Sequence, residues 1–127
     1  MAMVLVIDDE VDMARMIQDM LQSAGHQVVS ANDGEDGIGL LRAFPVELVI
    51  TDILMPKRDG LETIRVARKG APDLPIVAIS GGGQTGQMNY LQEAVEFGAD
   101  ATLKKPFGRD ELLRTIDGLL SGHNVDS

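Results

Sequence analysis

Acidic residues follow two of the apolar segments of this sequence. Asp8, Asp9 and Glu10 come directly after the apolar run Met3–Ile7, and Asp52 follows a second run at 47–51. Two carboxylates about 5 Å apart repel each other by roughly 3 kcal/mol at an effective dielectric near 20. Such a group requires a cation or a raised carboxyl pKa. Because oxygen ligands that are few in number favour Mg²⁺ with retained waters, these acids predict a Mg²⁺ site if the fold brings them together.

A hydroxyl group and an ammonium group follow two further apolar runs. Ser80 comes directly after the run 76–79, and two lysines, Lys104 and Lys105, come directly after the run 101–103. An anion bound beside Asp52 would meet positive charge from Mg²⁺ and from one of these lysines and a hydrogen bond from Ser80. Phosphoryl transfer requires this arrangement, with Asp52 as the nucleophile.

Five short apolar runs, which predict strands, must position these residues. They lie at Met3–Ile7, 27–30, 47–51, 76–79 and 101–103, and segments with helical spacing separate them. This alternation predicts an α/β fold with parallel strands and right-handed crossovers. Because the runs 27–30 and 101–103 are the most polar, we expect them at the edges. The prediction is a doubly wound, flavodoxin-like, three-layer fold with a five-stranded sheet in the order 2-1-3-4-5.

The carboxyl ends of parallel strands meet at one edge of the sheet, where ligands bind between strands 1 and 3 in this order. Neighbouring strands lie about 4.8 Å apart, so Asp8 or Asp9 should approach Asp52, and a lysine that follows the fifth strand can span the remaining distance of roughly 10 Å. Each residue alone has an ordinary structural explanation, such as an acid at the start of a helix or an Asp in a turn. Their joint occurrence at four strand ends favours a functional site.

The composition limits the classes of protein to consider. The chain has 127 residues, which fits one domain, and we expect a domain over 1–120 and a short flexible tail at 121–127. Its net charge of −9 argues against direct binding of nucleic acid. The absence of Cys excludes disulfides and thiolate chemistry and favours a cytoplasmic location. No apolar run is long enough to span a membrane.

Four motifs occur together in the following order: the acidic run DDE at 8–10, DxxMPxxDG at 52–60, the serine after the fourth predicted strand, and KPF at 105–107. In these motifs the sequence resembles the receiver domains of two-component response regulators, and the resemblance covers residues 3–120. It implies that Asp52 accepts a phosphoryl group from a phosphohistidine of a sensor histidine kinase or phosphotransfer protein. It also implies a downstream protein target of unknown identity and no enzymatic activity beyond self-phosphotransfer and autodephosphorylation.

The resemblance also implies roles for the residues around Asp52. Asp9 and the backbone carbonyl of Leu54 would bind Mg²⁺ directly, and Asp8 would act through water. Ser80 would be the switch hydroxyl. Lys105 would pair with the phosphoryl group, and the peptide bond that follows it, before proline, would be cis.

The sequence departs from the family at Thr102, where receiver domains usually carry Tyr or Phe. A swing of an aromatic ring therefore cannot be the output step. We expect the glycine-rich segment 81–87 to carry the signal instead, since glycine permits conformations closed to other residues and suits a segment that becomes ordered on phosphorylation.

Three other functions remain as alternatives. A haloacid-dehalogenase-like Mg²⁺-dependent phosphatase would also use an Asp nucleophile, but it expects a second Asp at position 54, which is Leu. A flavodoxin-like electron carrier would place small polar residues after the first strand, where the acids would repel its phosphate. A receiver-like interaction module that is never phosphorylated is the third. Whether the domain acts alone or within a longer chain, and whether it dimerises, stays open.

Overall fold

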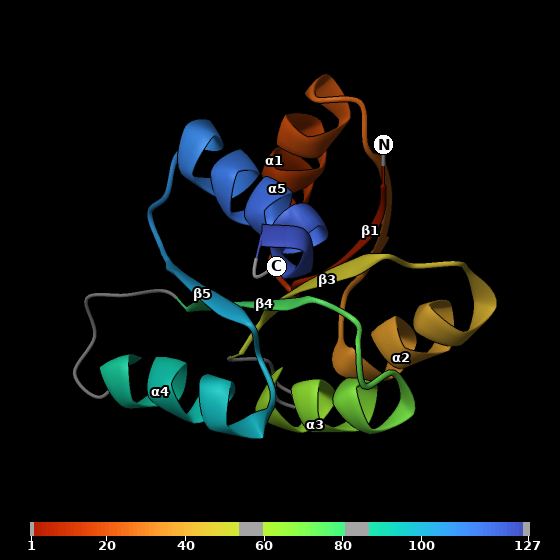
Figure 1. Cartoon of the computed structure of the whole chain (residues 1–127), viewed down its shortest axis with the longest axis vertical. Helices are drawn as coiled ribbons and strands as arrows, with labels where there is room; N and C mark the ends of the chain where they lie inside the picture. Colours follow the sequence, from red (N-terminus) through yellow and green to blue (C-terminus); the bar gives the residue numbers. More distant parts are fainter. Residues whose placement is uncertain (1, 54–59, 81–86, 126–127) are drawn as a thin grey trace.

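Strands and helices alternate along the whole chain (Figure 1). The computed structural model describes residues 2–53, 60–80 and 87–125. The elements are β1 (Met3–Ile7), α1 (Val11–Ser23), β2 (Gln27–Ala31), α2 (Gly34–Ala43), β3 (Leu48–Asp52), α3 (Gly60–Gly70), β4 (Ile76–Ser80), α4 (Gln87–Phe97), β5 (Ala101–Lys104) and α5 (Arg109–Val125). The strands lie within one residue of the predicted apolar runs at both ends.

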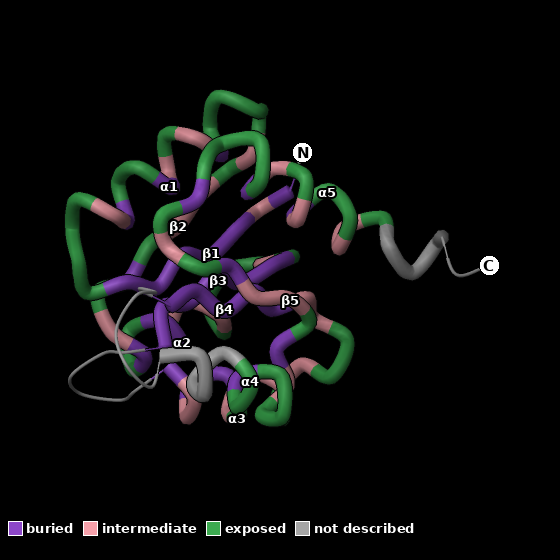
Figure 2. Tube along the Cα trace, turned by 90° about the vertical axis from the view of Figure 1, so that its left-hand side faces the viewer, coloured by how far each residue is buried: buried purple, intermediate pink, exposed green. Residues whose placement is uncertain are grey.

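The strands form one parallel sheet in the order β2-β1-β3-β4-β5, which confirms the predicted topology. Helices α1 and α5 cover one face of the sheet, and α2, α3 and α4 cover the other (Figure 1). The central strands β3 and β4 are buried at every position, whereas β2 and β5 are partly exposed. Figure 2 shows this buried centre in purple, surrounded by the exposed outer surfaces of the helices.

Two apolar cores lie on the two faces of the sheet, because successive side chains of a strand point to opposite faces. Val6 and Ile50 belong to the core beneath α1 and α5, while their neighbours Leu5 and Val49 belong to the core beneath α2, α3 and α4. The helices contribute buried aliphatic side chains to each core: Ile17, Leu21, Leu112 and Ile116 on the first face, and Ile38, Ile64, Ala67 and Ala94 on the second. Both faces of the sheet are therefore closed, as a parallel sheet requires.

Glycine residues follow the ends of two helices. Gly25 and Gly98 follow α1 and α4 with φ of 95° and 126°, a left-handed conformation that favours glycine. Helix α5 continues past residue 120 as far as Val125. Within the described ranges, no helix combines the length and apolar character that crossing a bilayer demands.

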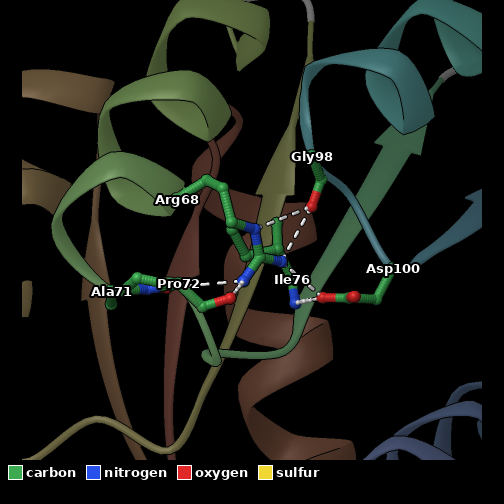
Figure 3. A network of polar contacts seen from close by, with 6 residues as sticks. All are labelled: Arg68, Ala71, Pro72, Ile76, Gly98 and Asp100. Atoms are coloured by element: carbon green, nitrogen blue, oxygen red, sulfur yellow. Dashed lines mark hydrogen bonds and ion pairs between the residues drawn. The ribbon is translucent and has the colours of Figure 1, made fainter.

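A polar network joins three segments at the amino ends of β4 and β5 (Figure 3). The Arg68 guanidinium at the end of α3 donates to the carbonyls of Gly98, at 2.8 Å, and Pro72, at 2.6 Å. It also pairs with Asp100, with 2.6 Å between Nη2 and Oδ2. The same Asp100 oxygen accepts a hydrogen bond from the backbone N–H of Ile76 at 2.8 Å. This network fixes the edge of the sheet opposite the predicted site.

Candidate functional site

Asp8 and Asp52 lie side by side at the carboxyl edge of the sheet. Ile7 pairs with Thr51 in the register of β1 and β3, so the residues that follow them reach the same level. The N–H of Asp8 donates to the Ala31 carbonyl at 3.1 Å and continues the ladder to β2. The residues are 1% and 5% exposed, so both carboxylates are held in a largely desolvated position.

Ser80 and Lys105 reach the same edge from β4 and β5. Ser80 ends β4, is fully buried and pairs in register with Lys104. The backbone N–H of Lys105 donates to the Ser80 carbonyl at 2.8 Å, which holds the two strand ends together. The Lys105–Pro106 peptide bond is cis, as the resemblance implied.

The Lys105 ammonium lies among three carboxylates. Its Nζ is 3.0 Å from Glu10 Oε1, 3.6 Å from Asp52 Oδ2 and 3.7 Å from Asp8 Oδ2. Burial alone would lower the pKa of Lys105, but the hydrogen bond to Glu10 and the charges of Asp52 and Asp8 outweigh it and raise the pKa above its usual 10.5. Lys105 is therefore a permanent cation beside Asp52.

The Asp8 carboxylate is poorly compensated. Its Oδ1 accepts a hydrogen bond from the backbone N–H of Glu10 at 2.9 Å, but Oδ2 has no hydrogen-bond partner among the described residues. Burial, assisted by the charge of Asp52, raises the pKa of Asp8 to about 6, although the Glu10 hydrogen bond acts in the opposite direction. Among the described residues, the site thus has more buried negative charge than positive charge to neutralise it.

Three carboxylates are placed to hold a metal ion. Oxygens of Asp8, Glu10 and Asp52 lie within 4.8 Å of one another, and a set of carboxylate oxygens is the donor chemistry that Mg²⁺ prefers. Oδ2 of Asp8, which accepts no hydrogen bond from the described residues, is a position that a cation would satisfy.

The structure brings some of the predicted site residues together and leaves others apart. It brings Asp8, Asp52 and Lys105 together, whereas Asp9 is exposed and is not a member of the carboxylate group found among the described residues. Leu54, whose carbonyl was predicted to bind Mg²⁺, lies outside the described residues, and its role stays a prediction. The resemblance assigns no role to Glu10, which the structure places in the carboxylate group. Its position as the third acid of one run was the available signal.

Gly60 controls how α3 begins next to Asp52. A Cβ atom at this residue would collide with the backbone carbonyl of Asp52 and with Cα of Ile53. The backbone N–H of Gly60 donates to the Ile53 carbonyl at 3.0 Å. Since backbone atoms cannot move aside as a side chain can, only glycine permits this contact. The glycine of the motif at 52–60 therefore positions the strand end that carries Asp52.

Comparison with known families gives one match that covers nearly the whole chain: residues 4–117 match the response regulator receiver domain. Among curated proteins, the chain is 37% identical over 113 residues to the transcriptional regulatory protein DltR of Streptococcus agalactiae serotype III (strain NEM316). The match covers 88% of this chain and 49% of DltR, so the chain spans about half the length of that relative.

Solved structures agree with this match. The chemotaxis protein CheY4 of Vibrio cholerae superposes with a TM-score of 0.84 at 29% identity, covering 94% of this chain and 98% of CheY4. A response regulator receiver domain protein from Clostridium thermocellum superposes with a TM-score of 0.89 at 26% identity, and each chain is covered in full. The chain therefore belongs to the response regulator receiver domain family, whose members are signalling modules.

Proposed function

We propose that this receiver domain is switched by transfer of a phosphoryl group from a phosphohistidine onto Asp52. The donor is a sensor histidine kinase or a phosphotransfer protein. The observation that carries the proposal is the 3.6 Å approach of Lys105 Nζ to Asp52 Oδ2, because it puts a fixed cation beside the one carboxylate that ends a central strand. In the transfer, an Asp52 oxygen forms the new O–P bond as the N–P bond breaks. The histidine nitrogen keeps the electron pair of the broken bond.

Lys105 and Ser80 are proposed to bind the phosphoryl oxygens. Lys105 offers positive charge and N–H donors at a position already within reach of Asp52. Ser80 ends the neighbouring strand, and its hydroxyl is proposed as the switch group that turns toward the phosphoryl oxygens. Because the backbone of Lys105 donates to the Ser80 carbonyl, both donors are carried by strand ends that are fixed to each other.

A Mg²⁺ site formed by Asp8, Asp9, Asp52 and the Leu54 carbonyl is part of the proposal. The buried Asp8 oxygen supports it, because this oxygen accepts no hydrogen bond from the part of the chain that the structure describes, and so does the raised pKa of that carboxyl. When bound, Mg²⁺ supplies positive charge for the transferred phosphoryl oxygens. The carboxylates of the chain hold their positions through the strand register and through the hydrogen bond from Glu10 to Asp8.

The output is proposed to be a change in the segment 81–87 that a downstream protein target recognises. Thr102, on β5, is half-buried and has no ring that could swing inward. Residues 81–86 lie outside the described part of the chain, so their role rests on the sequence alone. The proposal also includes a domain over residues 1–120 that acts in the cytoplasm and makes no direct contact with nucleic acid or a membrane.

The test is incubation with acetyl phosphate and Mg²⁺, followed by intact-protein mass spectrometry. We expect the mass increase of a single phosphoryl group, sensitive to hydroxylamine as an acyl phosphate is, and no increase in Asp52→Asn. Asp12→Asn is the matched control, since Asp12 is an exposed acid in the first turn of α1. Phosphorylation of Asp52→Asn equal to wild type would overturn the assignment. Continuous hydrolysis of a phosphate monoester such as p-nitrophenyl phosphate would instead support a phosphatase.

A further inference from the structure

Glu10 directs its side chain to the site instead of to its own helix. It is the N-cap of α1, with extended backbone angles, yet its side chain makes no capping hydrogen bond. Its backbone N–H donates to Asp8 Oδ1 at 2.9 Å, which fixes the residue beside the acidic cluster. Its carboxylate then reaches across to the loop after β5 and lies 3.0 Å from Lys105 Nζ. The ordinary role of an acid at a helix start therefore does not account for this side chain.

Of the three carboxylates around Lys105, Glu10 is the nearest and the most exposed. The side chains of Glu10, Asp52 and Asp8 are 64%, 7% and 1% exposed. An exposed carboxylate exchanges an ion pair for water at little cost in free energy, whereas a buried one loses its compensation when its partner leaves. Glu10 is thus the partner that Lys105 can most easily give up.

The charge of the site changes in a way that favours this release. Among the described residues, three carboxylates face the Lys105 ammonium, so negative charge is in excess in this part of the site. A phosphoryl group on Asp52 brings further negative charge and oxygens that accept from Lys105. Withdrawal of Glu10 into water then removes one like charge and frees donors on Lys105 for the phosphoryl oxygens.

We infer that Glu10 is a displaceable placeholder for the phosphoryl group on Lys105. In the unphosphorylated domain it holds the ammonium at the rim of the site, and in the phosphorylated domain a phosphoryl oxygen takes its place. Glu10 is therefore a positioning residue that sets how readily the phosphorylated state forms. This inference rests on the proposed function and deepens it.

The test measures how tightly beryllofluoride, a tetrahedral phosphoryl analogue, binds at saturating Mg²⁺ by isothermal titration calorimetry. Removal of an exposed ion pair that competes with the analogue should lower its dissociation constant by about threefold in Glu10→Gln. Glu10→Asp keeps the charge but is one methylene too short to reach Lys105, so it should also bind more tightly. Asp12→Asn removes a charge from the same turn of α1 and should remain close to wild type.

A second readout uses the metal-free protein. In NMR relaxation measurements on the Lys105 ammonium group, Glu10→Gln and Glu10→Asp should both increase its mobility, while Asp12→Asn should not. Unchanged mobility and unchanged beryllofluoride affinity in both Glu10 variants would overturn the placeholder. So would a Glu10→Asp variant that behaves as wild type, because charge alone would then explain the effect.

The outcomes also separate this inference from the proposed function. A loss of Mg²⁺ affinity of more than about tenfold in Glu10→Gln, equal to losing a metal ligand, would overturn the placeholder and leave phosphorylation of Asp52 intact. Failure of the wild-type protein to bind beryllofluoride with Mg²⁺ would contradict the proposed function itself.

Discussion

The two edges of the sheet differ in how completely their charged groups are paired. At the amino ends of β4 and β5, the Arg68 guanidinium meets two carbonyls and the Asp100 carboxylate, and Asp100 also accepts from the backbone (Figure 3). At the carboxyl ends, a single ammonium faces three carboxylates, and Asp8 keeps a buried oxygen without a hydrogen-bond partner among the described residues. The charges at the amino ends are paired, whereas negative charge is in excess among the described residues at the carboxyl ends.

The difference separates residues that stabilise the fold from residues that bind a ligand. A satisfied network lowers the free energy of the folded state and needs nothing further. A site with excess negative charge raises that free energy until a cation arrives, and this cost is the usual consequence of a functional site. Substitutions at the two edges should therefore change stability in opposite directions.

The largest expected effect is at the satisfied edge. Arg68→Ala should lower the free energy of unfolding by about 3 kcal/mol, because the Gly98 and Pro72 carbonyls and the Asp100 carboxylate lose a charged donor. Urea unfolding followed by circular dichroism measures it. Arg65→Ala is the control, since Arg65 is 64% exposed and only pairs with Glu62 one turn away. Equal losses in the two variants would show that the network adds no stability.

A smaller effect of opposite sign is expected at the acidic edge. Asp8→Asn should raise the free energy of unfolding of the metal-free protein by about 2 kcal/mol at pH 7. The amide cannot ionise, which removes the cost of a buried carboxylate whose pKa burial has raised to about 6, and its oxygen still accepts from Glu10. The same urea unfolding experiment measures the gain.

Mg²⁺ provides the control for this variant. If Asp8 serves the proposed metal site, Mg²⁺ at ten times its dissociation constant should stabilise the wild type by about 1.4 kcal/mol. The stability of Asp8→Asn should hardly respond to Mg²⁺. A variant less stable than the metal-free wild type would contradict the excess of charge argued for this edge.

The smallest effect is a dependence on pH. The pKa of Asp8 is about 6 in the folded protein and 3.8 when unperturbed, so the folded state binds more protons between these values. Stability from this group therefore rises as pH falls from 7 to 5, by about 1 kcal/mol. The advantage of Asp8→Asn over the metal-free wild type should shrink by the same amount. An advantage that is constant from pH 7 to 5 would show that the Asp8 carboxyl does not titrate in this range.

The order of the elements and the convergence of four strand ends followed from local patterns. Apolar runs mark strands in a sheet that is buried on both faces, and the residue after each run must reach the same edge. This reasoning placed Asp8, Asp52, Ser80 and Lys105 correctly along their strands. It did not find the contact between Glu10 and Lys105, because that contact depends on how α1 starts and on which side-chain conformations two long residues adopt.

Helix α2 shows a second limit of local reasoning. The sequence predicts that Gly37 and Gly39 weaken this helix by about 1 kcal/mol each. In the structure, a Cβ atom on Gly37 would collide with the Ile7 side chain, whereas one on Gly39 would meet open space. Gly37 therefore allows α2 to pack closely on β1. Intrinsic propensity does not contain this information, because the neighbour lies far away in the sequence.

Gly60 has a consequence for protein design. Any side chain at residue 60 would collide with the peptide group that joins Asp52 to Ile53. The residue at the start of α3 and the position of Asp52 therefore depend on each other. Grafting only the acids, the serine and the lysine onto another parallel sheet would transfer the chemistry without the geometry. A functional graft would also need a helix that begins with glycine and packs directly against the end of the grafted strand.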